Sequence, residues 1–377
     1  MESGTNNLSV RKRNRQAVLR SLYRERELTR KDIADRLGLS FPTVTQILGE
    51  LEEEGLVRTS GQQASTGGRR AFLNDIVPDA RAAVGVSVSR HWVDLALMNL
   101  SPNAVAAEEH RVMFEDTPAY WSGLNTLVGE LLEKNGVAPE RVLGVGISLP
   151  GVISAIGNAL EFAPTLGVER LELSRIASFF PAWHVTFGND ATLASRAEAW
   201  FRPGLGKAVY LLLSRGIGGA VISQGDEIFG SRGCEFGHMV IREGGKPCSC
   251  GRRGCLEAYC STGVLAEAVK WETPVSLEAF FEMVGQGVPE AAAAWEEYLG
   301  HLVTGIGNLR RIFDADLIIG GEMARFLRGY ADRLRQDLIR ESGGRETGEY
   351  LRFCNYGKHD AAIGAALQHI DRFLREV

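Results

Sequence analysis

The apolar positions near the start of the chain recur at the spacing of a helix. Three successive stripes have this period: Val18, Leu19 and Leu22; Ile33, Ala34 and Leu37; and Val44, Ile47, Leu48 and Leu51. The spacing predicts three short helices, each with one buried face.

The polar residues between these stripes are typical of helix ends. Thr29 is an expected N-cap with Asp32 three residues later, and Gly38 can adopt the left-handed conformation that ends a helix. Ser40 caps the next helix, whose first turn contains Pro42. Two short helices joined by such a turn form a helix–turn–helix, whose second helix enters the major groove of DNA.

The segment that follows predicts a wing. A strand can begin at Gly55–Arg58, a polar turn spans Gln62–Gly68, and a second strand can return at Arg70–Leu73. Arg69 and Arg70 stand next to two glycines, and such arginines suit phosphates or a narrow minor groove.

Further along, the pattern changes to strands that alternate with helices. Strands are expected at Ala82–Val88, Val93–Leu97, Val142–Leu149, Val185–Phe187, Ala208–Leu213 (continued by Ala220–Ile222) and Leu317–Ile319. Helices are expected at Trp121–Leu132, Ala191–Trp200 and Leu302–Ile312. This alternation indicates an α/β architecture, with ligands bound at the polar and glycine-rich loops that follow the strand ends. We therefore expect a winged helix–turn–helix domain over residues 1–78 and an α/β domain over residues 79–377.

Composition narrows the class of protein. The 377 residues are 45% hydrophobic and 24% charged, which excludes wholesale disorder and collagen-like repetition. No apolar run approaches the ~18–20 residues of a membrane helix, and the first residues do not resemble a secretory signal. We therefore expect a cytoplasmic protein.

Charge is unevenly distributed. The net charge of −5 argues against a protein that coats nucleic acid, yet the first 70 residues hold 13 Lys and Arg against 9 Asp and Glu. Charge alone fits a solvated helix face equally well, and many helical pairs are only structural. The basic segment, the caps and the wing together favour DNA binding. The expected DNA-binding residues are Thr43, Thr45 and Gln46 toward bases, Ser40 on the same helix face, Arg11, Arg13 and Arg15 toward phosphates, and Arg69 and Arg70 in the wing.

The sharpest local signal is a group of metal-ligating residues. His238 lies ten positions before Cys248, and Cys250 and Cys255 follow at short intervals. Three thiolates and one imidazole make the closed tetrahedral set that structural zinc prefers. The alternative is a loop of free cysteines without metal. Cys234, Cys260 and Cys354 lack this spacing and are interpreted as core thiols.

Two carboxylates flank the predicted metal site. Glu235 precedes His238 by three positions, and Glu257 follows Cys255 by two. A zinc ion would fix both carboxylates, and the second ring nitrogen of His238 could face a ligand hydroxyl. Each glutamate taken alone is also compatible with an ordinary surface charge.

Several motifs together resemble the ROK family, which comprises repressors, open reading frames and kinases of sugar metabolism. They are Leu39–Leu48 (LSFPTVTQIL), Gly67–Arg70 (GGRR), Leu149–Gly151 (LPG), Gly188–Asp190 (GND) and Gly230–Glu257. The winged helix in front of them is similar to the xylose- and N-acetylglucosamine-responsive repressors. The family's kinases lack this domain.

The resemblance implies an actin-like, hexokinase-like fold of two α/β lobes with a sugar cleft between them. By motif, it places the sugar-binding residues at Asn189, Asp190, Glu235, His238 and Glu257, and the zinc ligands at His238, Cys248, Cys250 and Cys255. In the kinases, the aspartate that matches Asp190 is the general base. It also hydrogen-bonds the sugar, so its presence does not establish catalysis.

This sequence departs from the kinase pattern in both phosphate loops. Where family kinases have Asp-x-Gly-Gly-Thr, this chain has Ser87–His91, so Ser87 replaces the acid, and Ser89 and Arg90 replace the glycines. Arg215 stands where the second loop normally has a threonine. Because phosphoryl transfer depends on positioning and charge stabilisation, we expect no enzymatic activity.

The leading hypothesis is therefore a sugar-responsive transcriptional regulator, in the first place a repressor. By resemblance it would act as a homodimer or homotetramer on operator DNA, with a sugar as effector and zinc as a structural ion. Two alternatives are an active sugar kinase with a DNA-binding domain and a regulator controlled by a partner protein. The set of five sugar-binding residues argues against the vestigial pocket that the last alternative requires.

Overall fold

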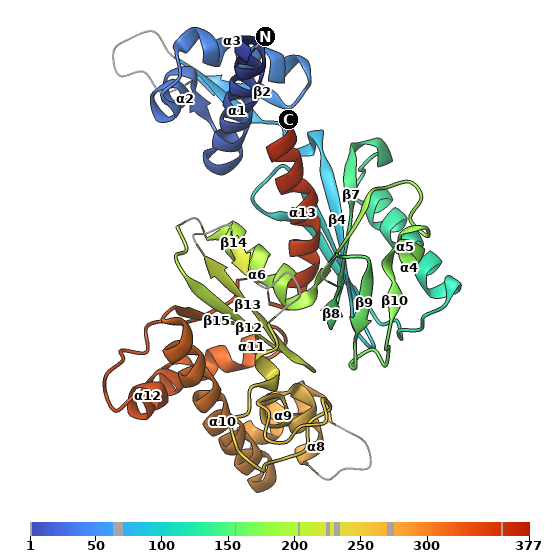
Figure 1. Cartoon of the computed structure of the whole chain (residues 1–377), viewed down its shortest axis with the longest axis vertical. Coiled ribbons are helices and arrows are strands. Elements are labelled where there is room, and N and C mark those ends of the chain that lie inside the picture. Colours follow the sequence, from blue (N-terminus) through green and yellow to red (C-terminus); the bar gives the residue numbers. More distant parts are fainter. Residues whose placement is uncertain are drawn as a thin grey trace.

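The structure, a computed structural model, describes residues 2–62, 71–154, 156–202, 204–223, 227–229, 234–269, 275–355 and 357–377. A small domain, here called the head (residues 2–76), lies at one end of a larger body (residues 78–377) that has two α/β lobes (Figure 1). Within the described ranges, no helix is both long enough and apolar enough to cross a membrane.

The head has the predicted helices and wing strands. Its elements are α1 (Glu2–Glu25), β1 (Leu28–Thr29), α2 (Arg30–Leu37), α3 (Phe41–Glu53), β2 (Val57–Gln62) and β3 (Phe72–Ile76). The strands form an antiparallel sheet in the order β1-β3-β2. The wing turn, including Arg69 and Arg70, lies outside the described residues.

The predicted helix ends are confirmed. The Thr29 hydroxyl accepts a hydrogen bond of 3.1 Å from the Asp32 backbone N–H, and the Asp32 carboxylate accepts one from the Thr29 N–H, which completes a capping box. Gly38 has φ +63° and closes α2. The Ser40 hydroxyl caps α3 through the Thr43 N–H. The apolar stripe of α3 is buried as predicted.

The first lobe of the body is built on a mixed sheet in the order β11-β7-β4-β5-β6. Its elements are η1 (Pro78–Ala80), β4 (Ala82–Val88), β5 (Val93–Asn99), β6 (Ala104–His110), α4 (Pro118–Lys134), η2 (Pro139–Arg141), β7 (Val142–Leu149) and β11 (Val185–Asn189). A smaller sheet in the order β10-β9-β8 lies beside it, formed by β8 (Val152–Ile153), β9 (Ala159–Phe162) and β10 (Leu171–Glu172), with α5 (Leu173–Ala177) following. The apolar face of α4, with Trp121 fully buried, covers one face of the main sheet.

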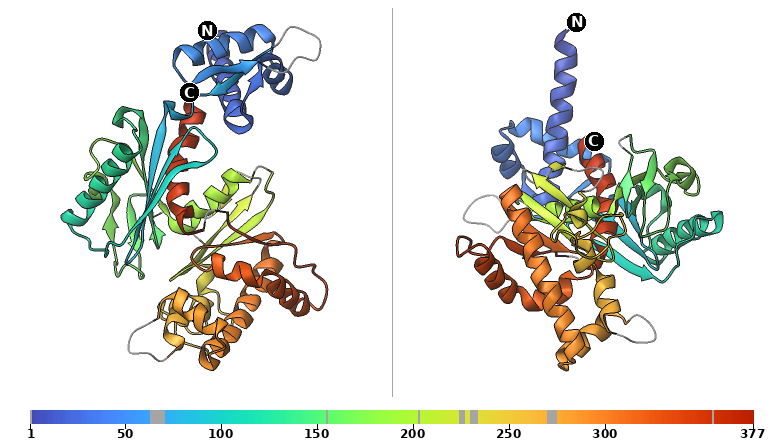
Figure 2. Two further views of the ribbon diagram at one scale, coloured as in Figure 1. Left: turned by 180° about the vertical axis from the view of Figure 1, so that it is seen from behind. Right: turned by 60° about the horizontal axis from the view of Figure 1, so that its bottom comes forward.

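The last helix of the chain, α13 (Asp360–Glu376), returns to this lobe and covers the other face of its sheet (Figure 2). Gly85 of β4 makes the close approach possible, since a Cβ there would lie 1.7 Å from the Ala362 carbonyl oxygen. Helix α6 (Asp190–Phe201) packs just as closely, because a Cβ on Gly364 would meet the Leu193 carbonyl oxygen at 1.7 Å. The two helices therefore form a tightly fixed pair.

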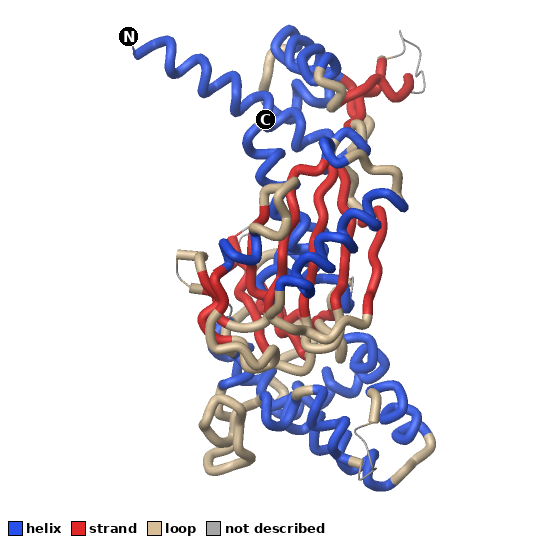
Figure 3. Tube along the Cα trace, turned by 90° about the vertical axis from the view of Figure 1, so that its right-hand side faces the viewer, coloured by secondary structure: helices blue, strands red, loops and turns tan. Residues whose placement is uncertain are grey.

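The second lobe has a sheet in the order β14-β13-β12-β15-β16. Its strands are β12 (Ala208–Leu213), β13 (Ile217–Ser223), β14 (Glu227–Phe229), β15 (Asp316–Gly320) and β16 (Leu351–Phe353). Its helices are η3 (Phe236–His238), α7 (Glu257–Cys260), α8 (Thr262–Ala268), α9 (Leu277–Gly285), α10 (Pro289–Phe313), α11 (Ala324–Leu327), η4 (Arg328–Tyr330) and α12 (Ala331–Glu341). The short helix η5 (Gly357–His359) leads into α13 and contacts β5 of the first lobe. In the side view of Figure 3, the strands of the body lie between the head and the helical end of this lobe.

One expected strand was wrong. Ala220–Ile222 does not continue β12 but belongs to β13, which pairs antiparallel with it so that Tyr210 faces Ala220. The polar and glycine-containing segment Ser214–Gly216 is long enough to form a hairpin turn, and the apolar run after it folds back as a neighbouring strand.

Candidate functional site

The four predicted metal ligands come together in the second lobe. His238 ends η3, whereas Cys248, Cys250 and Cys255 lie on the loop that leads to α7. Their ligand atoms all lie within 4.8 Å of one another. The Cys248 Sγ is 3.5 Å from the His238 Nδ1, and the sulfurs of Cys250 and Cys255 are 3.8 Å apart.

These separations fit a zinc ion. A tetrahedral centre with ordinary Zn–S and Zn–N bond lengths requires a sulfur–sulfur distance of ~3.8 Å and a sulfur–nitrogen distance of ~3.6 Å. The sulfurs are too far apart for a disulfide, whose bond is ~2.05 Å long. The donor set and its geometry therefore suit a closed structural zinc site.

The loop has the backbone needed to bring the cysteines together. The Cys248 N–H donates to the Arg252 carbonyl at 2.9 Å, and the Gly254 N–H donates to the Lys246 carbonyl at 2.8 Å. Gly254 has φ +81°, and a Cβ there would meet the Arg242 carbonyl oxygen at 1.7 Å. Burial opposes ionisation of Cys250, but hydrogen bonds from the backbone and side chain of Arg252 lower its pKa to about 6. A thiolate is the form that binds a metal.

Glu257 stands at the start of α7, two residues after the last cysteine. Its Oε2 accepts a hydrogen bond of 2.9 Å from the backbone N–H of Ile217, at the start of β13. Its Oε1 accepts one of 3.1 Å from the Ser249 hydroxyl, which belongs to the cysteine loop. The carboxylate is thus held between the cysteine loop and the central sheet of the lobe.

His238 faces two groups, one with each ring nitrogen. While Nδ1 faces Cys248, Nε2 lies 3.6 Å from a carboxylate oxygen of Glu235. The Glu235 side chain is 50% exposed, so it remains accessible to a ligand. The sequence predicts that this second ring nitrogen faces a ligand hydroxyl, whereas in the structure it faces the Glu235 carboxylate.

Asn189 and Asp190 lie where β11 passes into α6. The Asn189 Oδ1 caps α6 by accepting from the Thr192 N–H at 3.1 Å, and its Nδ2 donates to the Gly151 carbonyl at 2.9 Å. Both ends of this buried amide are therefore engaged within the protein, and Asn189 fixes the position of its neighbour. Desolvation raises the pKa of Asp190 to about 6, and repulsion from Glu235 acts in the same direction.

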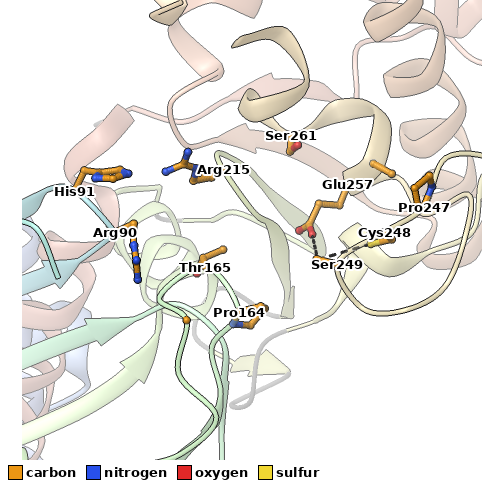
Figure 4. Close-up of a pocket in the computed structure, with 12 residues that line it drawn as sticks. Arg90, His91, Pro164, Thr165, Arg215, Pro247, Cys248, Ser249, Glu257 and Ser261 are labelled. Carbon is orange, nitrogen blue, oxygen red and sulfur yellow. Dashed lines mark hydrogen bonds between the residues drawn. The ribbon is translucent and has the colours of Figure 1, made fainter. Parts of the chain in front are cut away.

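A cavity of about 570 Å³, here called the interlobe cavity, opens between residues of the two lobes (Figure 4). It is lined by Arg90, His91, Pro164, Thr165, Gly167, Arg215, Pro247, Cys248, Ser249, Glu257, Ala258 and Ser261. Of the five predicted sugar-binding residues, only Glu257 lines it directly. His238 and Glu235 are linked to this wall, because Ser249 and Cys248 connect Glu257 to His238, which contacts Glu235. Asn189 and Asp190 do not line the cavity, although the Glu235 carboxylate acts electrostatically on Asp190.

Three polar residues of this wall, Ser249, Thr165 and Ser261, escaped sequence reasoning. Ser249 lies between two cysteines, and that position could have indicated its proximity to the site. Thr165 belongs to the first lobe and carries no motif that signals its place opposite the cysteine loop. Only the closing of one lobe over the other brings it there.

Some of the predicted DNA-binding residues of the head are accessible, whereas others are buried or held in ion pairs. Ser40, Thr43 and Gln46 lie on the accessible side of α3, whereas the Thr45 hydroxyl is buried. Arg15 is only 14% exposed and forms ion pairs with Glu50 and Glu54, so it holds α1 against the end of α3. The other two predicted arginines of α1 are accessible. Arg11 forms an ion pair with Glu50 but its side chain stays 57% exposed, and Arg13 is exposed.

Comparison with known proteins matches residues 83–371 to the ROK family and residues 11–58 to the winged helix-turn-helix DNA-binding family. The chain belongs to the ROK family. Among ROK relatives, the xylose repressor of Caldicellulosiruptor bescii is 25% identical over 370 residues, covering 89% of this chain and 90% of the relative. The DNA-binding transcriptional dual regulator NagC of Escherichia coli is 29% identical over 269 residues, covering 69% of this chain and 65% of NagC.

The ROK fold is also shared with solved structures. A ROK family transcriptional regulator, described as a homologue of the E. coli MLC protein, superposes with a TM-score of 0.73 over 97% of each chain at 20% sequence identity. The expected fold class, a winged helix–turn–helix in front of a hexokinase-like α/β domain, is confirmed.

Proposed function

We propose that this chain is a transcriptional repressor of sugar metabolism whose affinity for operator DNA is controlled by a sugar or sugar derivative bound at the interlobe cavity. The observation that carries this proposal is the position of α6. This helix begins at Asp190 beside the predicted sugar site and ends against the head, where Trp200 contacts Tyr23 of α1. One rigid element therefore touches both the effector site and the DNA-binding domain.

The effector acts by changing how far the lobes close. Asp190 belongs to the start of α6, whereas Glu257 and Glu235 belong to the second lobe, so a ligand that contacts all three favours one closure state. An effector shifts the equilibrium only by the difference between its affinities for the two states. The resulting change in lobe closure then changes the position of the head relative to the body.

Zinc has a structural role in this proposal. His238, Cys248, Cys250 and Cys255 would hold it, and the ion would keep Glu235 and Glu257 at fixed positions by tethering the segments on which they stand. The closed ligand set leaves no position for a reactive water.

DNA is bound by the head. Helix α3 enters the major groove with Ser40, Thr43 and Gln46 facing the bases, and Arg13 and Arg11 neutralise phosphates. A homodimer or homotetramer would present paired heads, so the operator would contain two half-sites at a spacing set by the protein.

The same site does not phosphorylate its sugar. Arg90 and His91 stand in the loop that follows β4 and occupy the wall of the interlobe cavity, where a phosphate-binding loop made of glycines would need open backbone. Asp190 then serves as a hydrogen-bonding partner of the sugar rather than as a general base.

The decisive experiment first isolates the operator DNA and then measures the affinity of the chain for it in the presence and absence of sugars. Genomic fragments selected by the purified chain supply the DNA, and fluorescence anisotropy then measures its affinity with and without a panel of free and phosphorylated sugars. We expect one sugar to change operator affinity at least about fivefold, a typical coupling between two sites. A chain that binds no specific DNA, or that transfers phosphate from ATP to a sugar, would contradict the proposal.

A further inference from the structure

One wall of the interlobe cavity is cationic. Arg90 and His91 approach from the first lobe, and Arg215 approaches from the turn between β12 and β13 of the second lobe (Figure 4). Residues that are 125 positions apart in the sequence, Arg90 and Arg215, therefore line the same space. Burial lowers the pKa of His91, and repulsion from Arg215, Arg90 and Arg111 lowers it further, which indicates that these groups share one electrostatic environment.

The charges of this wall are poorly compensated. Within the described part of the chain, neither Arg90 nor Arg215 has a carboxylate within 4.0 Å of its guanidinium group. Arg90 uses one N–H to donate to the Leu166 carbonyl at 2.5 Å, which orients the side chain and leaves its other donors available. Arg215 is exposed, and it interacts with Glu322 only at longer range. Two like charges held beside one cavity without a partner cost free energy that an anionic ligand would recover.

The opposite wall of the cavity carries a negative charge, that of Glu257. Glu257 is oriented there by Ile217 and Ser249, and as an acceptor it suits hydroxyl groups but repels an anion. Thr165, between the two walls, has a buried hydroxyl with no hydrogen-bond partner in the described residues. The cavity therefore has a hydroxyl-binding side, an anion-binding side and an unused polar group between them.

We propose that the effector is an anionic sugar derivative, such as a sugar phosphate, whose hydroxyl groups face Glu257 and whose anionic group is held by Arg90, His91 and Arg215. This inference rests on the proposed function and specifies its ligand class. Guanidinium groups bind phosphate through charge-assisted and often bidentate hydrogen bonds, and His91 adds a ring donor. A neutral sugar would leave the cationic wall uncompensated and would bind more weakly.

The test compares matched ligands by isothermal titration calorimetry on the full chain. The pairs are glucose and glucose 6-phosphate, xylose and xylose 5-phosphate, and N-acetylglucosamine and its 6-phosphate, with inorganic phosphate and ATP as separate probes. We expect the phosphorylated member of one pair to bind about 10- to 100-fold more tightly than its neutral partner. Inorganic phosphate and ATP should bind more weakly than that sugar phosphate.

Variants then assign the preference to the two arginines. Arg90→Gln and Arg215→Gln should each reduce affinity for the sugar phosphate about tenfold and leave the neutral sugar unchanged. Arg352→Gln, at the one exposed position of strand β16, removes the same charge from a surface ion pair with Asp316 and should change neither affinity. Thermal midpoints of all variants, measured in parallel, separate loss of binding from loss of folding.

The possible outcomes distinguish this inference from the function on which it rests. If neutral and phosphorylated sugars bind equally and still change operator affinity, the effector is neutral and only the present inference is wrong. If no sugar of either kind binds, the proposed function fails as well. If ATP binds most tightly and loses affinity in Arg90→Gln and Arg215→Gln, the cationic wall serves a nucleotide and the inference is overturned.

Discussion

The indole N–H of Trp200 donates a hydrogen bond of 3.1 Å to the hydroxyl of Tyr23, and the two rings meet edge to face with their centroids 5.5 Å apart. Trp200 lies in the last turn of α6, and Tyr23 lies near the end of α1. The Tyr23 hydroxyl in turn donates to the Ser101 carbonyl at 3.0 Å, in the loop between β5 and β6. One hydroxyl group thus joins the head to two elements of the body.

Tyr23→Phe should weaken the communication between the effector site and the DNA. The ring contact with Trp200 remains, but two hydrogen bonds are lost, and we expect a loss of stability of about 1–2 kcal/mol. The change that the effector causes in operator affinity should fall about fivefold, while its binding to the body is retained. Anisotropy with operator DNA and calorimetry with the effector measure the two quantities, and an unchanged response would exclude this contact from the coupling.

Glu257→Gln should abolish the sugar response and leave operator binding intact. The amide cannot accept from both Ile217 and Ser249, since its nitrogen is a donor, and a ligand hydroxyl loses a charged acceptor. We expect effector affinity to fall about 10- to 100-fold. A variant that still responds normally at ordinary effector concentrations would show that Glu257 does not belong to the site.

Asp190→Asn should stabilise the protein at neutral pH while it impairs effector binding. Folding raises the pKa of Asp190 from 3.8 to about 6, so the native state binds this proton more tightly than the unfolded state does. Stability therefore decreases as pH rises from about 4 to about 6, and the full cost remains above that range. The variant should gain about 1–2 kcal/mol at pH 7.5, allowing for the partial exposure of the site.

Urea unfolding of both proteins at pH 4 and pH 7.5 checks this expectation. The Asn side chain retains an oxygen that can accept from the Ala191 N–H, so the start of α6 should be preserved. Equal stabilities at pH 4 and a more stable variant at pH 7.5 are expected. A variant that is less stable at pH 7.5 would contradict the raised pKa.

Removal of the metal should eliminate sugar binding. Cys250→Ser, or treatment with a chelator, frees the segments that hold Glu235 and Glu257, and the thermal midpoint should decrease. Cys354→Ala removes a buried thiol outside the cluster and provides the matched control. Zinc content by atomic emission and effector affinity by calorimetry are measured together; full affinity in metal-free protein would refute the coupling.

The wing arginines should contribute to DNA affinity through phosphates. Replacing Arg69 and Arg70 by Ala should weaken operator binding and reduce the slope of log affinity against log salt by about 2. Arg15→Ala should instead lower the stability of the head, because Arg15 is ion-paired with Glu50 and Glu54. An unchanged salt slope in the double variant would remove the wing from the interface.

The local structure of the head and the metal loop could be predicted because both depend on short-range rules. The hydroxyl caps at Thr29 and Ser40, the left-handed Gly38 and the cysteine spacing act within a few residues, and each was recognisable in the sequence. The hairpin after Leu213 was missed, since an apolar run does not reveal which neighbour its strand will pair with.

The sequence by itself determined the fold class, the family and most candidate residues, because these follow from periodicity, capping and motif spacing. Only the tertiary structure decided which side chains share a space: Arg90 with Arg215, and Tyr23 with Trp200. It also showed that Asn189 and Arg15 are engaged within the protein. Such contacts join segments that are distant in the chain, and their geometry arises only when the close packing of α6 and α13 positions the two lobes and the head.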